Sequence, residues 1–456
     1  MKVALVGGGG FRTPLVWDAL ASLGEDARVD RLTLHDRSEV RLGRVTPVLE
    51  GLRQERGKGP TVTATTDLDE AVDGASVVLC AIRVGGLEGR ILDEAIPLRS
   101  GVLGQETVGP GGICFALRTI PAMLEIAELV ERRAPGAWFV NFTNPAGLVT
   151  EVLQDVMGDR AVGICDSPEA LCGRVAAALG RPRSELCFDY AGINHLGWLL
   201  AVDAGSGDLL PGLLRDERRL GRLDEARLFG DRHLREMGMI PNEYLVYIEQ
   251  ADAIAESFRR AGETRGEVLA RQQAGFYERS AESPAVALRA WRETRDARHG
   301  TYMVEAWGTR PPADDDGEVE GDTSTEQGPG ETGYAAVAAA FLNAIFGGEP
   351  QDIVLNVANG GRLPFLPADA VVEVPCLVGG EGARTRPGRH LPSEQAELVA
   401  RVKNAERLTI KAAREGSRDL ALDALFAHPL VRTRATARDI LDAYLSAFPG
   451  LAVALA

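Results

Sequence analysis

The chain has 456 residues, 45% of them hydrophobic, and a formal net charge of −16 at pH 7. This acidic balance disfavours nucleic acids and anionic membranes as partners, because both bind basic surfaces. The length exceeds what a single hydrophobic core supports, so we expect two domains or one large α/β body with an appended half.

Short apolar runs alternate with helical patterns in the first third of the chain. The runs cover residues 3–6, 31–36, 61–65, 76–82, 137–142 and 161–165. Unbroken apolar strands separated by helices are typical of a parallel sheet that is covered on both faces. We therefore predict an α/β fold with a Rossmann-like, doubly wound parallel sheet in residues 1–170.

A glycine cluster, GGGG, follows the first predicted strand and precedes a helix that we expect to begin near Pro14. Gly7 and Gly9 match the first two glycines of G-x-G-x-x-G, although Arg12 replaces the third. Asp36 ends the second strand, where a carboxylate can bind the ribose of NAD and would repel NADP. An ordinary turn is the alternative interpretation. The predicted NAD-binding residues are Gly7, Gly9, Gly10, Phe11, Arg12 and Asp36.

From about residue 171 the pattern changes to longer amphipathic helices with fewer strands. Residues 265–282 and 396–431 have apolar positions at helical spacing. We predict a larger, mainly helical α+β domain over 171–456. Residues 309–333 are rich in Pro, Gly and acidic side chains, so they bury too little surface to offset their ordering entropy. They are interpreted as a mobile insertion, with a substrate lid as the alternative.

The six cysteines are sparse, contain no C-x-x-C pair and favour a reducing, cytoplasmic location. No apolar run approaches the length of a membrane span. Taken alone, Cys165 has the pattern of a small core residue and His195 that of an interior histidine. A functional role for either one needs further partners.

Six motifs in chain order give such partners. They are IRVGGLEGR at 82–90, GVLGQETVGPGG at 101–112, NFTNPAG at 141–147, GICDSP at 163–168, GINHLGW at 192–198 and PNEYLVY at 241–247. Together they strongly resemble glycoside hydrolase family 4, the NAD- and divalent-metal-dependent glycosidases, over essentially the whole chain. Two stretches, RVGGLEGRILDEAIPL and VLGQETVGPGG, are most similar to the 6-phospho-β-glucosidases of that family.

The resemblance implies hydrolysis through transient oxidation, unlike the two-carboxylate mechanism of most glycosidases. NAD oxidises the C3 hydroxyl of the sugar to a ketone, which acidifies the C2 proton for removal by a base. The aglycone then leaves C1, water adds to the unsaturated ketone, and NADH reduces C3 again. The expected net reaction is hydrolysis of a 6-phospho-β-glucoside without net redox change.

The resemblance also assigns roles in catalysis and metal binding. Cys165 and His195 match the ligands of a divalent metal, for which we expect Mn²⁺, although thiolate and imidazole also suit zinc. Tyr244 matches the catalytic base, while Tyr247 of the same motif leaves another assignment open. Asp166 matches the proton donor of the α-specific members. Because many β-specific members carry Asn there, this residue conflicts with the β assignment.

Arg90, Asn144 and Arg265 match substrate-contacting positions of the family. Arginine suits a phosphate because its planar guanidinium makes bidentate, charge-assisted hydrogen bonds. The expected substrate is a phosphorylated disaccharide or aryl glycoside, and we expect a homodimer or homotetramer. The alternatives are a 6-phospho-α-glucosidase or α-galactosidase of the same family, a lactate- or malate-type dehydrogenase, and a non-catalytic sensor of NAD or a sugar phosphate.

Overall fold

The computed structural model describes most of the chain, namely residues 1–205, 207–281, 283–307 and 333–455. The predicted insertion at 309–333 therefore lies outside the described residues, except for Gly333, where a helix begins. The six strands predicted for the first third are all confirmed. They are β1 (Lys2–Val6), β2 (Arg31–His35), β3 (Thr61–Thr65), β4 (Val77–Cys80), β5 (Trp138–Asn141) and β6 (Ala161–Gly163).

These six strands are parallel, in the order β3-β2-β1-β4-β5-β6. The sheet then continues through antiparallel strands of the chain from residue 181 onwards, which we call the second half. Their order is β10-β11-β7-β8-β9, with β12 paired to β11. Their bounds are β7 (Cys187–Ile193), β8 (Leu196–Asp203), β9 (Ile240–Pro241), β10 (Gln351–Ala358), β11 (Val371–Gly379) and β12 (Gly382–Thr385). The predicted domain boundary near residue 170 stays a prediction, since one sheet spans it.

The helices of the first half cover the parallel strands. They are α1 (Thr13–Leu20), α2 (Glu39–Arg56), α3 (Leu68–Val72), α4 (Gly86–Arg99), α5 (Gly109–Arg133), α6 (Ala146–Met157) and α7 (Ser167–Leu179). Local sequence sets their ends: Ser38 caps α2 by accepting a hydrogen bond from the backbone of Arg41, and Gly57 ends that helix with a φ of 68°. The helix expected near Pro14 is α1.

The second half contributes many short helices and several long ones. They are α8 (Leu210–Arg215), α9 (Glu217–Leu220), α10 (Asp224–Phe229), α11 (Asp231–Met237), α12 (Val246–Glu249), α13 (Ala251–Ala261), α14 (Arg265–Arg279), α15 (Pro284–His299), α16 (Val304–Trp307), α17 (Gly333–Phe346), α18 (Ser393–Glu415), α19 (Arg418–Ala427), α20 (Arg434–Ala447) and α21 (Pro449–Ala454). The helix predicted over 396–431 is divided at Gly416, whose φ of 64° ends α18.

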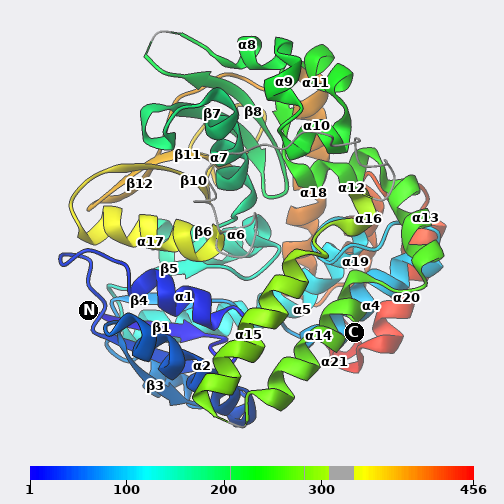
Figure 1. The fold of residues 1–456 in the computed structure, drawn as a ribbon. Helices are drawn as coiled ribbons and strands as arrows, with labels where there is room; N and C mark the ends of the chain where they lie inside the picture. The colour runs from blue at the N-terminus through cyan, green and yellow to red at the C-terminus, as the bar shows by residue number, and fades with distance from the viewer. Residues whose placement is uncertain (206, 282, 308–332, 456) are drawn as a thin grey trace.

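The two halves share one hydrophobic core. Trp17 and Leu32 from the first half belong to the same buried cluster as Trp291 and Phe341 from the second. Figure 1 shows α14 and α15 crossing the N-terminal half, where α15 packs on α2 and α14 on α4. Trp291 is 2% exposed, and its indole nitrogen donates a hydrogen bond to the carbonyl of Phe11 at 3.0 Å. The second half therefore supports the glycine turn of the first.

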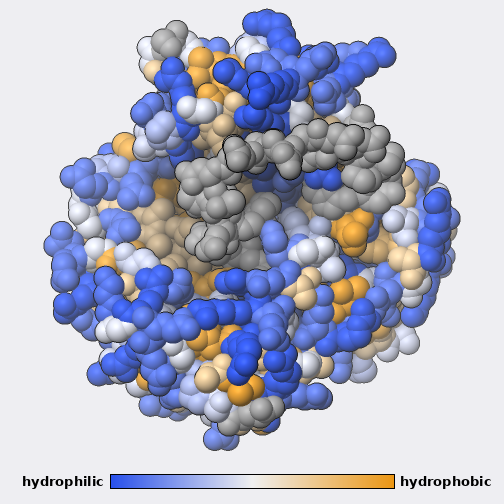
Figure 2. Space-filling model, viewed as in Figure 1, coloured by the Kyte–Doolittle hydropathy of each residue, from blue (hydrophilic) through white to orange (hydrophobic). Residues whose placement is uncertain are grey.

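The face shown in Figure 2 is mostly hydrophilic, and its hydrophobic residues lie in small separate groups. Most of the large hydrophobic side chains of the described residues are buried in the core clusters. Within the described ranges, no helix combines the length and the apolar character that crossing a membrane requires.

Truncation of Trp291 tests the packing of α15 on the glycine turn. Trp291→Ala removes a fully buried ring and leaves the Phe11 carbonyl without its donor, so we expect a loss of about 3–5 kcal/mol in the free energy of unfolding. Arg289→Ala, on the exposed face of the same helix, is the control, with a change within about 0.5 kcal/mol. Urea denaturation measures both, and equal stability of the two variants would contradict this packing role.

Candidate active site

A cavity of about 550 Å³ opens at the carboxyl ends of β1, β2, β4 and β5. Ligands bind at this edge in doubly wound sheets. Most residues that the sequence predicted for the site line this cavity, namely Gly7, Gly10, Phe11, Arg12, Asp36, Arg90, Asn144, Asp166, His195 and Tyr244. Three predicted residues, Gly9, Cys165 and Arg265, are not part of its lining.

The glycine turn fits a dinucleotide. Gly7 has a φ of 91°, and a Cβ there would lie 2.7 Å from the carbonyl oxygen of Ala81. The backbone nitrogen of Gly9 donates to the Asp36 carboxylate at 3.2 Å, and the Tyr277 hydroxyl donates to the Gly9 carbonyl at 2.9 Å. Only glycine at position 7 keeps this turn close to β4. A pyrophosphate can therefore approach the backbone here, next to the start of α1.

His195 occupies the turn between β7 and β8, with a φ of 64°. Its Nδ1 lies 3.0 Å from the hydroxyl of Thr107, and that hydroxyl donates to the Gln105 side chain at 3.0 Å. The Nδ1 hydrogen of His195 therefore donates to Thr107, which leaves the Nε2 lone pair available. Nε2 is buried and has no hydrogen-bond partner among the described residues. Burial lowers the pKa of His195 to about 3, so the ring is neutral and can bind a metal.

Cys165 follows β6 and is 1% exposed, with its Sγ 3.2 Å from the hydroxyl of Ser167. Burial, and then the charges of Glu373 and Asp166, raise the pKa of the Cys165 thiol well above its ordinary value. A bound cation would reverse this effect, because a metal stabilises the thiolate. Among the described residues no group of three or more His, Cys, Asp or Glu could hold a metal. The Cys165 sulfur and the free Nε2 of His195 are each of a type that binds divalent metals.

Tyr244 lies flat against His195, with ring centroids 3.7 Å apart and an interplanar angle of 6°. Its hydroxyl is 3.5 Å from that of Tyr302, which donates to Glu243 at 2.7 Å. Burial is the main cause that raises the pKa of Tyr244, and the charges of Glu243, Asp166 and Cys165 add to it. Tyr244 can therefore act as a base only if a cation close by stabilises the phenolate.

Asp166 is 6% exposed, and its Oδ2 has no hydrogen-bond partner among the described residues. Burial raises the pKa of Asp166 to about 7, although the Arg12 guanidinium opposes the shift. Part of the population is thus protonated at neutral pH, which suits a proton donor. The start of α17 packs on this side chain, because a Cβ at Gly333 would lie 2.4 Å from the Cβ of Asp166.

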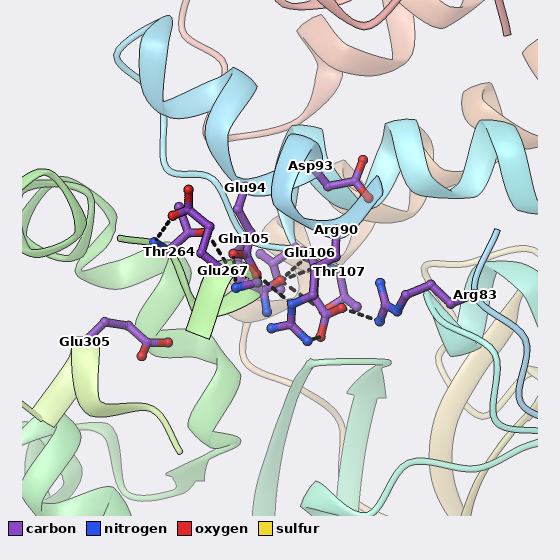
Figure 3. Close-up of polar contacts among 12 residues, drawn as sticks. Arg83, Arg90, Asp93, Glu94, Gln105, Glu106, Thr107, Thr264, Glu267 and Glu305 are labelled. Atoms are coloured by element: carbon purple, nitrogen blue, oxygen red, sulfur yellow. Dashed lines mark hydrogen bonds and ion pairs between the residues drawn. The ribbon is translucent and has the colours of Figure 1, made fainter. Parts of the chain in front are cut away.

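Arg90 of α4 forms ion pairs with Glu94 at 2.8 Å and Glu106 at 2.7 Å. Arg83 forms an ion pair with the same Glu106 carboxylate, and Figure 3 shows the two arginines reaching it from different directions. Burial opposes ionisation of Glu106, but the charges of Arg83 and Arg90 lower its pKa to about 2. Sequence reasoning missed Glu106, although it is the one charged residue of the GVLGQETVGPGG motif.

Arg265 lies at a smaller side cavity of about 70 Å³ rather than at the main one. Its guanidinium donates to the Arg298 carbonyl at 2.9 Å and to the Thr301 hydroxyl, at the end of α15. Arg298, which sequence reasoning also missed, lines both cavities and lies 4.7 Å from the ring centre of Phe11. Asn144 lines the main cavity, and its buried Oδ1 has no hydrogen-bond partner among the described residues.

Replacement of Glu106 tests the electrostatics of this cluster. Because its folded-state pKa of about 2 lies below the ordinary 4.5, Glu106 stabilises the fold above pH 4.5, and this stabilisation is lost as the pH falls towards 2. We expect Glu106→Gln to cost about 3 kcal/mol at pH 7 and progressively less below pH 4.5. Urea denaturation across this pH range measures it, with the exposed Glu88→Gln as control. A pH-independent cost would contradict the assignment.

Similar proteins include glucosidases of both anomeric types. A 6-phospho-alpha-glucosidase from Lacticaseibacillus paracasei is 28% identical, over 97% of this chain and 96% of the relative. A probable 6-phospho-beta-glucosidase from Bacillus subtilis is 29% identical, over 98% of this chain and 96% of the relative.

Solved structures agree with these relatives. The Thermotoga maritima 6-phospho-beta glucosidase, determined with manganese, NAD+ and glucose-6-phosphate, has a TM-score of 0.81 and 26% identity, with 99% of both chains covered. Malate dehydrogenase from Plasmodium falciparum, covering 91% of this chain and 99% of its own, has a TM-score of 0.50 and 12% identity, which indicates a shared fold alone.

Two family models cover almost the whole chain. The model of the family 4 glycosyl hydrolases matches residues 2–181, and the model of the C-terminal domain of that family matches residues 190–431. The two matches adjoin each other and leave out few residues. The chain therefore belongs to family 4 of the glycosyl hydrolases.

Proposed function

We propose that this protein is an NAD- and divalent-metal-dependent 6-phosphoglucosidase that prefers β-glucosides. The observation that carries the proposal is the stacked pair of His195 and Tyr244. The pair lines the same cavity as the glycine turn at Gly7, and the imidazole keeps a free Nε2. A site for a hydride acceptor, a candidate metal ligand and a candidate base therefore share one cavity.

The proposed cofactor sites use two separate groups of residues, in and beside this cavity. Gly7, Gly9 and Asp36 would hold NAD, and Cys165 with His195 would hold Mn²⁺. When bound, NAD accepts and returns a hydride at C3 of the sugar, while the metal supplies Lewis-acid stabilisation of charge on the sugar oxygens. Both ligand side chains are buried, so this charge would be stabilised in a medium of low dielectric constant.

Tyr244 would remove the C2 proton, and Asp166 would protonate the leaving group. Tyr247 is less suited to the role of base, because its hydroxyl donates to Glu305 at 2.7 Å and it is not part of the main cavity lining. Asp166 is suited to donate because burial keeps part of it protonated near pH 7. The two side chains line the cavity together.

The sugar phosphate would be bound by arginines. Because the chain has a net charge of −16, it needs such local positive charge to attract a dianion. Arg12, Arg90 and Arg298 line both the main and the side cavity. Glu106 neutralises part of this charge, so that the arginines can be buried together before a dianion binds. Arg265 would contribute through the side cavity.

Family membership disfavours both a dehydrogenase and a sensor, since Cys165, His195 and Tyr244 are needed together only for the glycosidase chemistry.

The location and the assembly remain proposals. The chain would act in the cytoplasm, where its five buried thiols and the exposed Cys187 stay reduced. It would assemble as a homodimer or homotetramer.

Cofactor dependence is the first test. Hydrolysis of nitrophenyl β-glucoside 6-phosphate should require both NAD and Mn²⁺ and should stop when either is left out. Because the hydride returns to C3 in each cycle, NADH should not accumulate in proportion to nitrophenolate. Cys165→Ser should keep the fold and lose activity by orders of magnitude. Stoichiometric NADH would favour a dehydrogenase, and full activity of Cys165→Ser with excess chelator would exclude Cys165 from the metal site.

The anomer is the second test. Values of kcat/KM for the β- and α-linked nitrophenyl glucoside 6-phosphates are compared under identical Mn²⁺ and NAD. We expect the β-substrate to be preferred and Asp166→Asn to have little effect with nitrophenolate, a good leaving group that needs no proton. A tenfold or greater preference for the α-substrate, about 1.4 kcal/mol in transition-state energy, would overturn the β assignment.

A further inference from the structure

Glu373 of β11 is a buried carboxylate to which the proposed reaction gives no role. Its side chain is 0% exposed, and no ion pair joins it to an arginine or lysine of the described residues. It accepts hydrogen bonds from the amides of Asn194 at 3.1 Å and Asn356 at 3.0 Å, and from the Tyr190 hydroxyl at 3.2 Å. Three neutral donors therefore surround this carboxyl group inside the sheet.

One arm of this network leads towards Cys165. The Asn242 amide donates to the Tyr190 hydroxyl at 3.2 Å and to the Ser167 hydroxyl at 2.9 Å. The Ser167 hydroxyl lies 3.2 Å from the Sγ of Cys165. The side-chain oxygen of Asn242 also accepts from the backbone nitrogen of Tyr244 at 3.0 Å. This arm fixes the loop of one proposed metal ligand together with the proposed base.

The other arm leads to His195. Asn194 directly precedes His195, and its side-chain oxygen accepts from the backbone nitrogen of Ala146 at 3.1 Å, two residues after Asn144. Since its amide is held by Glu373 at the same time, Asn194 is fixed at both ends of its side chain. The carboxylate of Glu373 thus joins the loops that carry Cys165 and His195, which are far apart in the sequence.

An anion in this position is costly without a cation. Burial of a carboxylate that lacks a charged partner costs several kcal/mol, and a hydrophobic residue of similar size is often as stable or more so. Burial also raises the pKa of Glu373 to about 7. The charge of Glu373 is close enough to act on the thiol of Cys165. A divalent cation bound at Cys165 and His195 would supply the missing positive charge, because Glu373 and the thiolate together carry two negative charges.

We propose that Glu373 is the outer-sphere carboxylate of the metal site, which orients the loops of Cys165 and His195 and balances the charge of the bound dication. The inference rests on the proposed function, since it assumes that these two residues hold the metal. Glu373 is a positioning residue: it acts through its hydrogen-bonded neighbours and need not contact the substrate.

Metal affinity of the cofactor-free protein tests this role without any measurement of turnover. Mn²⁺ is titrated into each variant, and the free ion is followed by its electron paramagnetic resonance signal. Glu373→Gln keeps the shape of the side chain and an acceptor oxygen but removes the charge, so we expect Kd for Mn²⁺ to rise about tenfold to a hundredfold. Tyr190→Phe keeps the charge but breaks the arm towards Cys165, and a smaller rise is expected.

Glu151→Gln is the matched control. Glu151 is also buried, but Lys403 and Arg407 neutralise it, and among the described residues none of its hydrogen bonds or ion pairs reaches the loops of Cys165 or His195. We expect its Kd for Mn²⁺ to stay within about twofold of the unchanged protein. NAD affinity and circular dichroism check that each variant is folded. A merely structural defect would weaken NAD binding and reduce the circular dichroism signal of the helices.

A folded Glu373→Gln variant that binds NAD normally and has an unchanged Kd for Mn²⁺ would overturn the proposal. If this variant does not fold, Tyr190→Phe decides, and an unchanged Kd there overturns it as well. Failure of the proposed function gives a different result: Cys165→Ser would then bind Mn²⁺ as tightly as the unchanged protein. Loss of Mn²⁺ binding in Cys165→Ser, with Glu373→Gln unaffected, would keep the metal site and reject only the role of Glu373.

Discussion

The partly buried charges of Arg83, Arg90 and Glu106 meet where α4, the loop before α5 and the cavity adjoin. Glu106 can be ionised in this interior only because two guanidinium groups face it, and they can be buried only because it is there. The next residue along the chain, Thr107, holds the Nδ1 of His195, and His195 in turn supports the ring of Tyr244. The position of the proposed base therefore depends on an ion cluster that contacts it only indirectly.

The site also depends on the way in which the two halves of the chain share one core. The glycine turn belongs to the first half, but Tyr277 and Trp291 from the second half donate to its carbonyls at Gly9 and Phe11. In the opposite direction, Cys165 follows the last parallel strand and is linked through the Ser167 hydroxyl to Asn242, within the motif of Tyr244. Neither half could form the cavity alone. A reaction that needs a dinucleotide and a metal-bound sugar together is suited to such a shared site.

The sequence predicted the six parallel strands, the glycine turn and several residues of the cavity lining, because each depends on a local pattern of apolar residues or on a short motif. Glu106 lay inside a quoted motif, yet its importance comes from Arg83 and Arg90, which are separated from it in the chain. Glu373 is a single charge within a buried strand, and its partners come from three other strands and loops. Arg265 was predicted to contact substrate, but it lies at the side cavity and donates to the end of α15. This position depends on tertiary packing, which a local motif does not reveal.

The central claim is that hydrolysis proceeds by removal of the C2 proton after transient oxidation at C3. Proton nuclear magnetic resonance of glucose 6-phosphate formed in D₂O tests it most directly, with NAD and Mn²⁺ present. The account predicts that deuterium from the solvent enters C2, because the base exchanges its proton with water, while C3 stays protonated, because the same hydride returns. A product that carries no deuterium at C2 would contradict the account and would favour direct displacement at C1 by water or a carboxylate.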